Sequence, residues 1–167
     1  MKKTAYSPPG MLKSRLENSR KEFELLVRKM KKLKPDKLDE MIHALHSEAF
    51  ARFDCLECAN CCKTIGPLLI PSDAERLARH LKMKIADFHK IYTTSDEDND
   101  LVFNTHPCPF LMSDNYCSVY ESRPRACREY PHTDRKRFYQ ILNLSLENCK
   151  TCPVVFSIFE ELSKTIM

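Results

Sequence analysis

The feature that most constrains this chain is a run of four cysteines within eight positions, CLECANCC, at residues 55–62. Cys55, Cys58 and Cys61 form two overlapping CxxC units, and Cys62 stands directly beside Cys61. A disulfide between such neighbours is unfavourable, because adjacent Cα atoms are about 3.8 Å apart whereas most disulfides span about 4.4–6.8 Å. We therefore expect these thiols to do something other than bridge each other.

The chain has nine cysteines among 167 residues, so full internal pairing would leave one thiol over. Its opening, MKKTAYSPPGMLKSR, is basic but lacks the apolar segment of a signal peptide, and no run of about 18 apolar residues exists. We expect a cytoplasmic protein without a membrane span. In a reducing compartment, many cysteines indicate metal or redox chemistry rather than structural disulfides.

Only two glycines are present, which disfavours glycine-rich phosphate loops and turn-rich β folds. Apolar residues recur at helical spacing over residues 11–33 and again over 36–53, with Pro35 ending the first helix and Asp36 capping the second. We expect these two helices to form an antiparallel hairpin after a loose tail at residues 1–10. The predicted fold class is mainly α with a small β-hairpin.

We divide the chain into an N-terminal tail and basic helical hairpin, residues 1–50, and a metal-stabilised cysteine-cluster domain, residues 51–167. A helix over 71–81 is expected to be capped by Ser72 or Asp73, with a Ser72–Glu75 capping box. The other expected elements are a short helix over 84–92, a solvated loop over 93–100, strands near 101–104, 109–112 and 116–120 with a turn at 113–115, a short helix after Pro124 and an amphipathic helix from Pro153.

Clustered thiolates are soft ligands that suit zinc, copper(I) and iron–sulfur clusters. The CxxCxxC order is typical of the start of a ferredoxin ligand run, although Ile65 occupies the usual fourth position. Two separated CxxC pairs, residues 55–58 and 149–152, are also compatible with a zinc site. The nearly all-sulfur ligand set slightly favours an iron–sulfur cluster over zinc. The cysteines could form one metal centre or two.

The ordered segments CLECANCCK, PCPFL, YCSVYESRPRACREYP and a late CP resemble the YkgJ-type cysteine-cluster proteins over about residues 53–155. The signature of that family is CxxCxxCC, and the family is described as zinc- or iron-chelating. The resemblance implies a metal site and adds Cys149 as a further candidate outside the family pattern. The metal ligands it implies are Cys55, Cys58, Cys61, Cys62, Cys108, Cys117, Cys127 and Cys152.

The cysteine region is also similar to that of flagellin lysine methylases, where it is associated with an iron–sulfur cluster. The chain has no glycine-rich strand-to-helix turn for a methyl donor, so we do not expect methyl transfer.

Three arginines, Arg123, Arg125 and Arg128, surround Cys127. Nearby positive charge stabilises thiolates, so we expect these arginines to support the metal site from outside its ligand set. The alternative is surface pairing with Glu121 and Glu129.

His106 and His132 flank cysteine segments and are the histidines considered as further metal ligands. His43 and His46 are three residues apart in the second helix, but no third ligand completes a site. We expect these two to be ordinary helix residues.

The leading hypothesis is a metal-binding protein that holds zinc or an iron–sulfur cluster. Two alternatives stay open: a redox enzyme or electron-transfer protein with an iron–sulfur centre, and an adaptor for protein or nucleic acid with a structural zinc. A thiol oxidoreductase is disfavoured, because nothing resembles the thioredoxin βαβ setting. Whether the protein is an enzyme is left undecided, and no catalytic residues are assigned.

Residues 1–37 carry twelve Lys and Arg against four Asp and Glu, a net charge of +8. This basic segment is a candidate surface for a protein partner, whereas nucleic acid is not favoured.

Overall fold

The computed structural model describes residues 6–167. Its contacts divide the chain into two units. Among the described residues, the helical unit combines residues 6–54 with residues 131–167, and the cysteine unit is Cys55–Tyr130. Residues 131–167, which the sequence analysis groups with the cysteines, therefore pack with the N-terminal helices.

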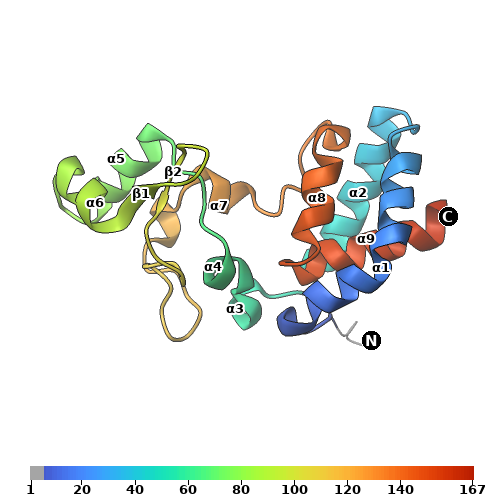
Figure 1. Cartoon of the computed structure of the whole chain (residues 1–167), viewed down its shortest axis with the longest axis horizontal. Coiled ribbons are helices and arrows are strands. Elements are labelled where there is room, and N and C mark those ends of the chain that lie inside the picture. The colour runs from blue at the N-terminus through green and yellow to red at the C-terminus, as the bar shows by residue number, and fades with distance from the viewer. Residues whose placement is uncertain (1–5) are drawn as a thin grey trace. The chain divides into compact units, whose positions relative to one another are not determined.

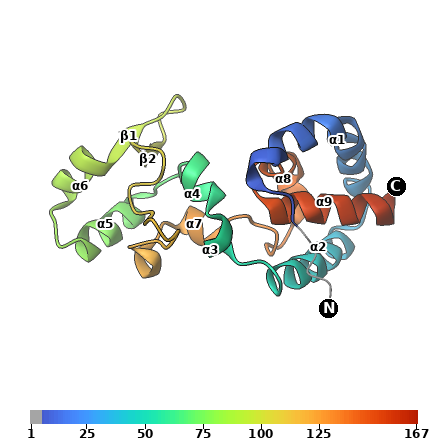
Figure 2. The same cartoon turned by 90° about the horizontal axis from the view of Figure 1, so that it is seen from below.

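The helical unit is built on the C-terminal helix. Its elements are α1 (Pro9–Met30), α2 (Pro35–Phe50), the 3₁₀ helix η2 (Phe138–Ile141), α8 (Leu142–Asn148) and α9 (Pro153–Ile166), as Figure 1 shows. Both α1 and α2 pack against α9, which lies between them (Figure 2). The two predicted helices are present, but their apolar stripes pack against α9 and not mainly against each other.

The expected apolar stripe of α1 is confirmed, because six of its residues are buried. Phe23 lies at the centre of this contact, with its ring 5.4 Å from the rings of both Phe156 and Phe159 on α9. Ion pairs add to the rim, including Arg20 on α1 with Glu147 on α8 at 2.6 Å. The buried α1 residues are Leu12, Leu16, Phe23, Leu26, Val27 and Met30.

The N-terminal segment is more ordered than predicted, because α1 begins at Pro9 and the Tyr6 hydroxyl donates to the Ala49 carbonyl at 3.0 Å. The first part of the expected loose tail, residues 1–5, lies outside the described residues. Pro35 occupies the first turn of α2 instead of simply ending α1, since proline's missing N–H costs nothing there. Asp36 therefore lies within that turn rather than at the cap.

The cysteine unit contains short elements. They are α3 (Cys55–Cys58), α4 (Asn60–Thr64), α5 (Pro71–His80), α6 (Ile85–Tyr92), β1 (Thr93–Ser95), β2 (Leu101–Phe103), the 3₁₀ helix η1 (Tyr120–Ser122) and α7 (Arg125–Glu129). The described chain is mainly helical with one small antiparallel sheet, which confirms the predicted fold class. None of the described helices is long and apolar enough to cross a membrane.

The small sheet is not where the hairpin was expected. β1 pairs with β2, placing Thr93 opposite Phe103, and the acidic residues between the strands form the turn. The Asp96 carboxylate accepts the amides of Asp98 and Asp100, which tightens this turn. The expected hairpin around residues 113–115 is reduced to a single bridge between Leu111 and Cys117.

A small apolar core holds α5, α6 and the sheet together. Cys108 and Cys117 pack against its edge, so two of the candidate ligands are positioned by ordinary hydrophobic contact. The buried members of this core are Leu69, Ala74, Leu77, Ala78, Phe88, Phe103, Phe110 and Val119.

We predict that Phe23→Ala lowers the free energy of unfolding of the helical unit by about 3–5 kcal/mol, because it removes a buried ring from the α1–α9 contact. Urea denaturation followed by circular dichroism measures the loss. The matched control is Leu25→Ala on the same helix, where the side chain is 44% exposed and the loss should be small. Equal losses in both variants would contradict the packing described here.

Candidate metal centre

The cysteine-rich run folds into two single turns of helix, α3 and α4, joined at Ala59. Ala59 has a φ of 47°, in the left-handed region, so the chain turns sharply between Cys58 and Cys61. Neither turn contributes a buried residue of its own, and Ala59 between them is buried. This segment therefore has little apolar packing to hold it.

A main-chain hydrogen bond links the first cysteine segment to the second. The Cys108 amide donates to the Cys62 carbonyl at 2.8 Å. Gly66 lies beside the same segment, and a Cβ atom added there would stand 3.2 Å from His106 Cε1. The absence of a side chain at Gly66 therefore allows the close approach of the residues around 62–66 to those around 102–108.

Four cysteines from distant segments influence one another electrostatically. Burial is the largest cause that raises the pKa of Cys127 to about 12, and the neighbouring charges of Cys62, Cys108 and Cys117 add to it. Burial, together with Cys62 and Cys117, similarly raises the pKa of Cys108 to about 11. The pKa of Cys117 is also raised by burial and by Cys62. The four thiols Cys62, Cys108, Cys117 and Cys127 thus lie in one neighbourhood.

Cys62 is the member common to every one of these interactions, and it also raises the pKa of Cys58. Its own pKa falls to about 7, because the Cys61 thiol donates a hydrogen bond to it and the Lys63 charge is close. The two adjacent cysteines therefore face each other within one thiol cluster. Burial opposes this lowering.

Lys63 is a residue near the cluster that the sequence analysis did not select. Its ammonium donates to the Cys58 carbonyl at 3.1 Å, and its charge lowers the pKa of both Cys58 and Cys62. Its position directly after the Cys61–Cys62 pair is the sequence feature that could have identified it.

The three predicted arginines behave differently from one another. The Arg123 guanidinium stacks over the Tyr120 ring at 3.7 Å and lowers the pKa of Cys117 and Cys127 through its charge. Arg125 forms an ion pair with Glu129 at 2.6 Å, which is the surface alternative considered above. Arg128 is exposed on α7. Of the three, Arg123 is the one whose charge acts on cysteines in this structure.

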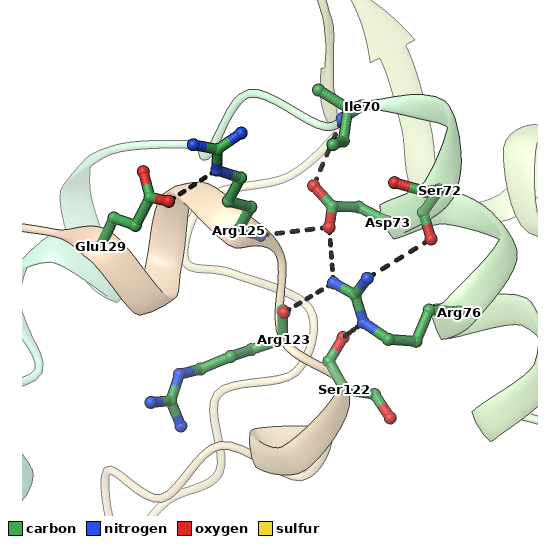
Figure 3. A network of polar contacts seen from close by, with 8 residues as sticks. All are labelled: Ile70, Ser72, Asp73, Arg76, Ser122, Arg123, Arg125 and Glu129. Atoms are coloured by element: carbon green, nitrogen blue, oxygen red, sulfur yellow. Dashed lines mark hydrogen bonds and ion pairs between the residues drawn. The ribbon is translucent and has the colours of Figure 1, made fainter.

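A second group, Asp73 and Arg76 of α5, bonds to the main chain of residues 122–125, which lead to Cys127 (Figure 3). The sequence pattern indicates Asp73 only as a possible helix cap and does not indicate Arg76. The Asp73 carboxylate, 1% exposed, accepts from the Ile70 amide at 3.3 Å and from the Arg125 amide at 3.1 Å. It corrects the predicted Ser72–Glu75 capping box, since the residue that closes the first turn is Asp73. The available signal was an acidic residue one turn before Leu77, on the apolar side of the helix.

The histidines lie elsewhere or have other contacts. His43 contacts the Arg135 carbonyl at 3.0 Å and His46 contacts the Thr133 hydroxyl at 2.7 Å. The His106 ring lies against Gly66, and His132 belongs to the helical unit. Metal binding by His106 or His132 stays a prediction.

Cys149 and Cys152 lie in the helical unit, whereas the other seven cysteines lie in the cysteine unit. Both are buried, and the Cys149 thiol donates to the Ser145 carbonyl at 3.5 Å. Burial, with Cys152 nearby, holds the pKa of Cys149 well above its ordinary value. A role for either residue as a metal ligand stays a prediction.

The donor set of the cysteine unit suits a soft metal, because it consists of cysteine thiols from three sequence segments. Among residues 6–167, no three His, Cys, Asp or Glu side chains already stand in the arrangement of a metal site.

The chain matches the family model described as "CxxCxxCC: Putative zinc- or iron-chelating domain" over residues 54–153. Because this match covers more than half of the chain, the protein belongs to that family. Membership of the CxxCxxCC family, predicted from the cysteine signature, is thereby confirmed. The closer likeness to YkgJ-type proteins and the likeness to flagellin lysine methylases stay predictions. No curated protein and no solved structure matches the chain.

We predict that Cys62 is the fastest-reacting thiol of this cluster in the metal-free protein near neutral pH. Its pKa of about 7 makes it substantially thiolate there, whereas Cys108 and Cys127, at about 11 and about 12, stay protonated. Labelling with iodoacetamide over a pH series, followed by peptide mass spectrometry, measures this order.

The Cys61→Ala variant tests the cause, since it removes the hydrogen bond to Cys62 and should move the labelling midpoint of Cys62 to higher pH. An unchanged midpoint would show that the bond does not set this pKa.

Proposed function

We propose that this protein binds a zinc ion or an iron–sulfur cluster through the thiolates of its cysteine unit. The observation that supports this most directly is the shared neighbourhood of Cys62, Cys108, Cys117 and Cys127, which come from three separate segments. Cys55, Cys58 and Cys61 complete the proposed donor set from the adjoining turns α3 and α4. Cys152, with Cys149, remains a candidate from the sequence pattern alone.

The raised pKa values show that deprotonating the buried thiols is unfavourable, and a bound metal would offset this cost. Without a cation, burial and mutual repulsion keep Cys108 and Cys127 protonated. A bound metal supplies the missing positive charge and displaces these protons, so its affinity should increase with pH. From outside the ligand set, the Arg123 charge lowers the pKa of Cys117 and Cys127, and the Lys63 charge lowers the pKa of Cys58 and Cys62.

The identity of the metal separates the alternatives. A bound iron–sulfur cluster can change valence, which would support electron transfer or a redox enzyme. Zinc has no redox chemistry and would make the domain a stable scaffold for interaction. We retain a small preference for iron–sulfur, because the proposed ligands are all sulfur.

An adaptor role has one specific observation in its favour. Five exposed cations lie in and around the turn between α1 and α2. Lys31, Lys32 and Lys34 are in the turn itself, Arg28 is in the last turn of α1 and Lys37 is near the start of α2. An acidic protein surface is the partner chemistry that fits such a turn. We also propose a cytoplasmic location, because a chain rich in cysteines with metal-ligand spacing suits a reducing compartment.

Anaerobic purification followed by elemental analysis, sulfide assay and a visible spectrum tests the metal proposal. A brown protein with iron and acid-labile sulfide supports the cluster, and a colourless protein with stoichiometric zinc supports the scaffold. A folded protein with no metal, whose thiols all titrate freely and which takes up none of these metals, would refute both forms of the proposal.

We predict that Cys62→Ser lowers metal content and metal affinity more than any substitution in the helical unit, because Cys62 influences the pKa of each of the other cluster thiols. The matched control is Cys149→Ser, which replaces a buried cysteine outside the cysteine unit. Metal-to-protein ratios of the two purified variants give the comparison. The prediction fails if Cys149→Ser loses as much metal as Cys62→Ser.

We also predict that Cys58→Ser or Cys61→Ser lowers the melting temperature of the loaded protein, since metal binding and folding are coupled. α3 and α4 have little packing of their own, so their order should depend strongly on ligation. Thermal denaturation with and without metal measures the effect. Unchanged melting temperatures in both variants would contradict the coupling.

A further inference from the structure

The Asp73–Arg76 pair is unusual because almost all its bonds outside α5 go to the main chain of one other segment. Arg76 donates to the carbonyls of Ser122, at 3.3 Å, and Arg123, at 2.9 Å. Asp73 accepts the amide of Arg125 at 3.1 Å. The main chain between Cys117 and Cys127 is thereby held by hydrogen bonds at Ser122, Arg123 and Arg125 (Figure 3).

The two side chains of the pair also bind each other. Arg76 binds Asp73 at 2.5 Å, and Asp73 accepts the Ile70 amide at the start of α5. The Asp73 carboxylate is almost fully buried, so removing any of its partners would leave a buried charge poorly compensated. Such an arrangement restricts the position of its partners more tightly than an exposed ion pair.

We call the Asp73–Arg76 pair the clamp. Cys127 depends on the clamp more than the other cluster thiols do. Cys108 and Cys117 pack against the apolar core, and Cys62 is tied to Cys108 by a main-chain bond. α7, the helix that carries Cys127, is a single turn with no fully buried residue of its own. Its start at Arg125 is bonded directly to Asp73, two residues before Cys127.

We infer that Asp73 and Arg76 are positioning residues that hold Cys127 beside Cys62, Cys108 and Cys117 for metal binding. This inference rests on the proposed function. Neither residue is a metal ligand in this role. Asp73 and Arg76 set the place of one thiolate by fixing the main chain that leads to it.

The test measures cobalt(II) binding to the reduced, metal-free full-length protein, by absorption titration. Asp73→Asn and Arg76→Gln should each weaken cobalt affinity by about 10–100-fold, the usual effect of removing support behind a metal ligand. If Cys127 leaves a four-thiolate set, the sulfur-to-cobalt charge-transfer absorption should also fall by about a quarter. Arg76→Lys keeps the charge beside Asp73 but loses the planar fork, so it should give an intermediate affinity.

Glu75→Gln and Arg79→Gln are matched controls, because both residues are exposed on the same helix. Both should bind cobalt as the wild type does. Asp96→Ala controls for stability, since it removes the bonds to the Asp98 and Asp100 amides that tighten the β1–β2 turn of the same unit. At equal melting temperature, Asp96→Ala should keep the wild-type cobalt spectrum whereas Asp73→Asn should not.

Three results would overturn the inference. The first is wild-type cobalt affinity and spectrum in both clamp variants. This result would refute the role of the clamp but not the proposed metal binding. The second is a loss in Asp96→Ala equal to that in the clamp variants, which would reduce the pair to a general stabilising role. The third is a wild-type protein that binds no cobalt, zinc or iron, in which case the proposed function fails as well.

Discussion

The hydrogen bond from the Cys108 amide to the Cys62 carbonyl joins the two halves of the cysteine unit. It brings the weakly packed turns α3 and α4 to a segment whose own place is fixed by an apolar core. The Asp73–Arg76 clamp adds the third segment, which carries Cys127. The neighbourhood of thiols is thus assembled by main-chain bonds, a buried carboxylate and hydrophobic contact, none of which involves sulfur.

The elements that could be predicted from the sequence are those whose signals lie within a few neighbouring residues. The apolar stripe around Phe23 and the helix-favouring start at Pro153 both depend on residues a few positions apart, and both helices are present. The strand at residues 93–95 was missed, because Thr-Thr-Ser is short and polar and becomes a strand only by pairing with β2. The bonds from Asp73 and Arg76 cross about 50 positions, and periodicity carries no information about such partners.

The electrostatics of the cluster explain why cations recur around it. Burying several thiols together favours their neutral forms, which is the opposite of what a metal ligand needs. Lys63 and Arg123 partly offset this cost, and the hydrogen bond from Cys61 makes Cys62 the most acidic of the cluster thiols with a resolved shift. Under the proposed function, Cys62 is therefore the thiol best prepared to receive a metal before the more basic Cys108 and Cys127 release their protons.

The dependence of α1 and α2 on α9 has a consequence for how the protein is made. α2 ends at Phe50 and α9 begins at Pro153, so about 100 residues must be translated before the apolar stripes are covered. At about 5–20 residues per second, the ribosome needs roughly 5–20 s for that stretch. The cysteine unit is continuous in sequence and is complete at Tyr130. It can therefore fold during synthesis while Phe23 and its neighbours still await their partner helix, which makes the nascent N-terminal helices natural clients for a chaperone.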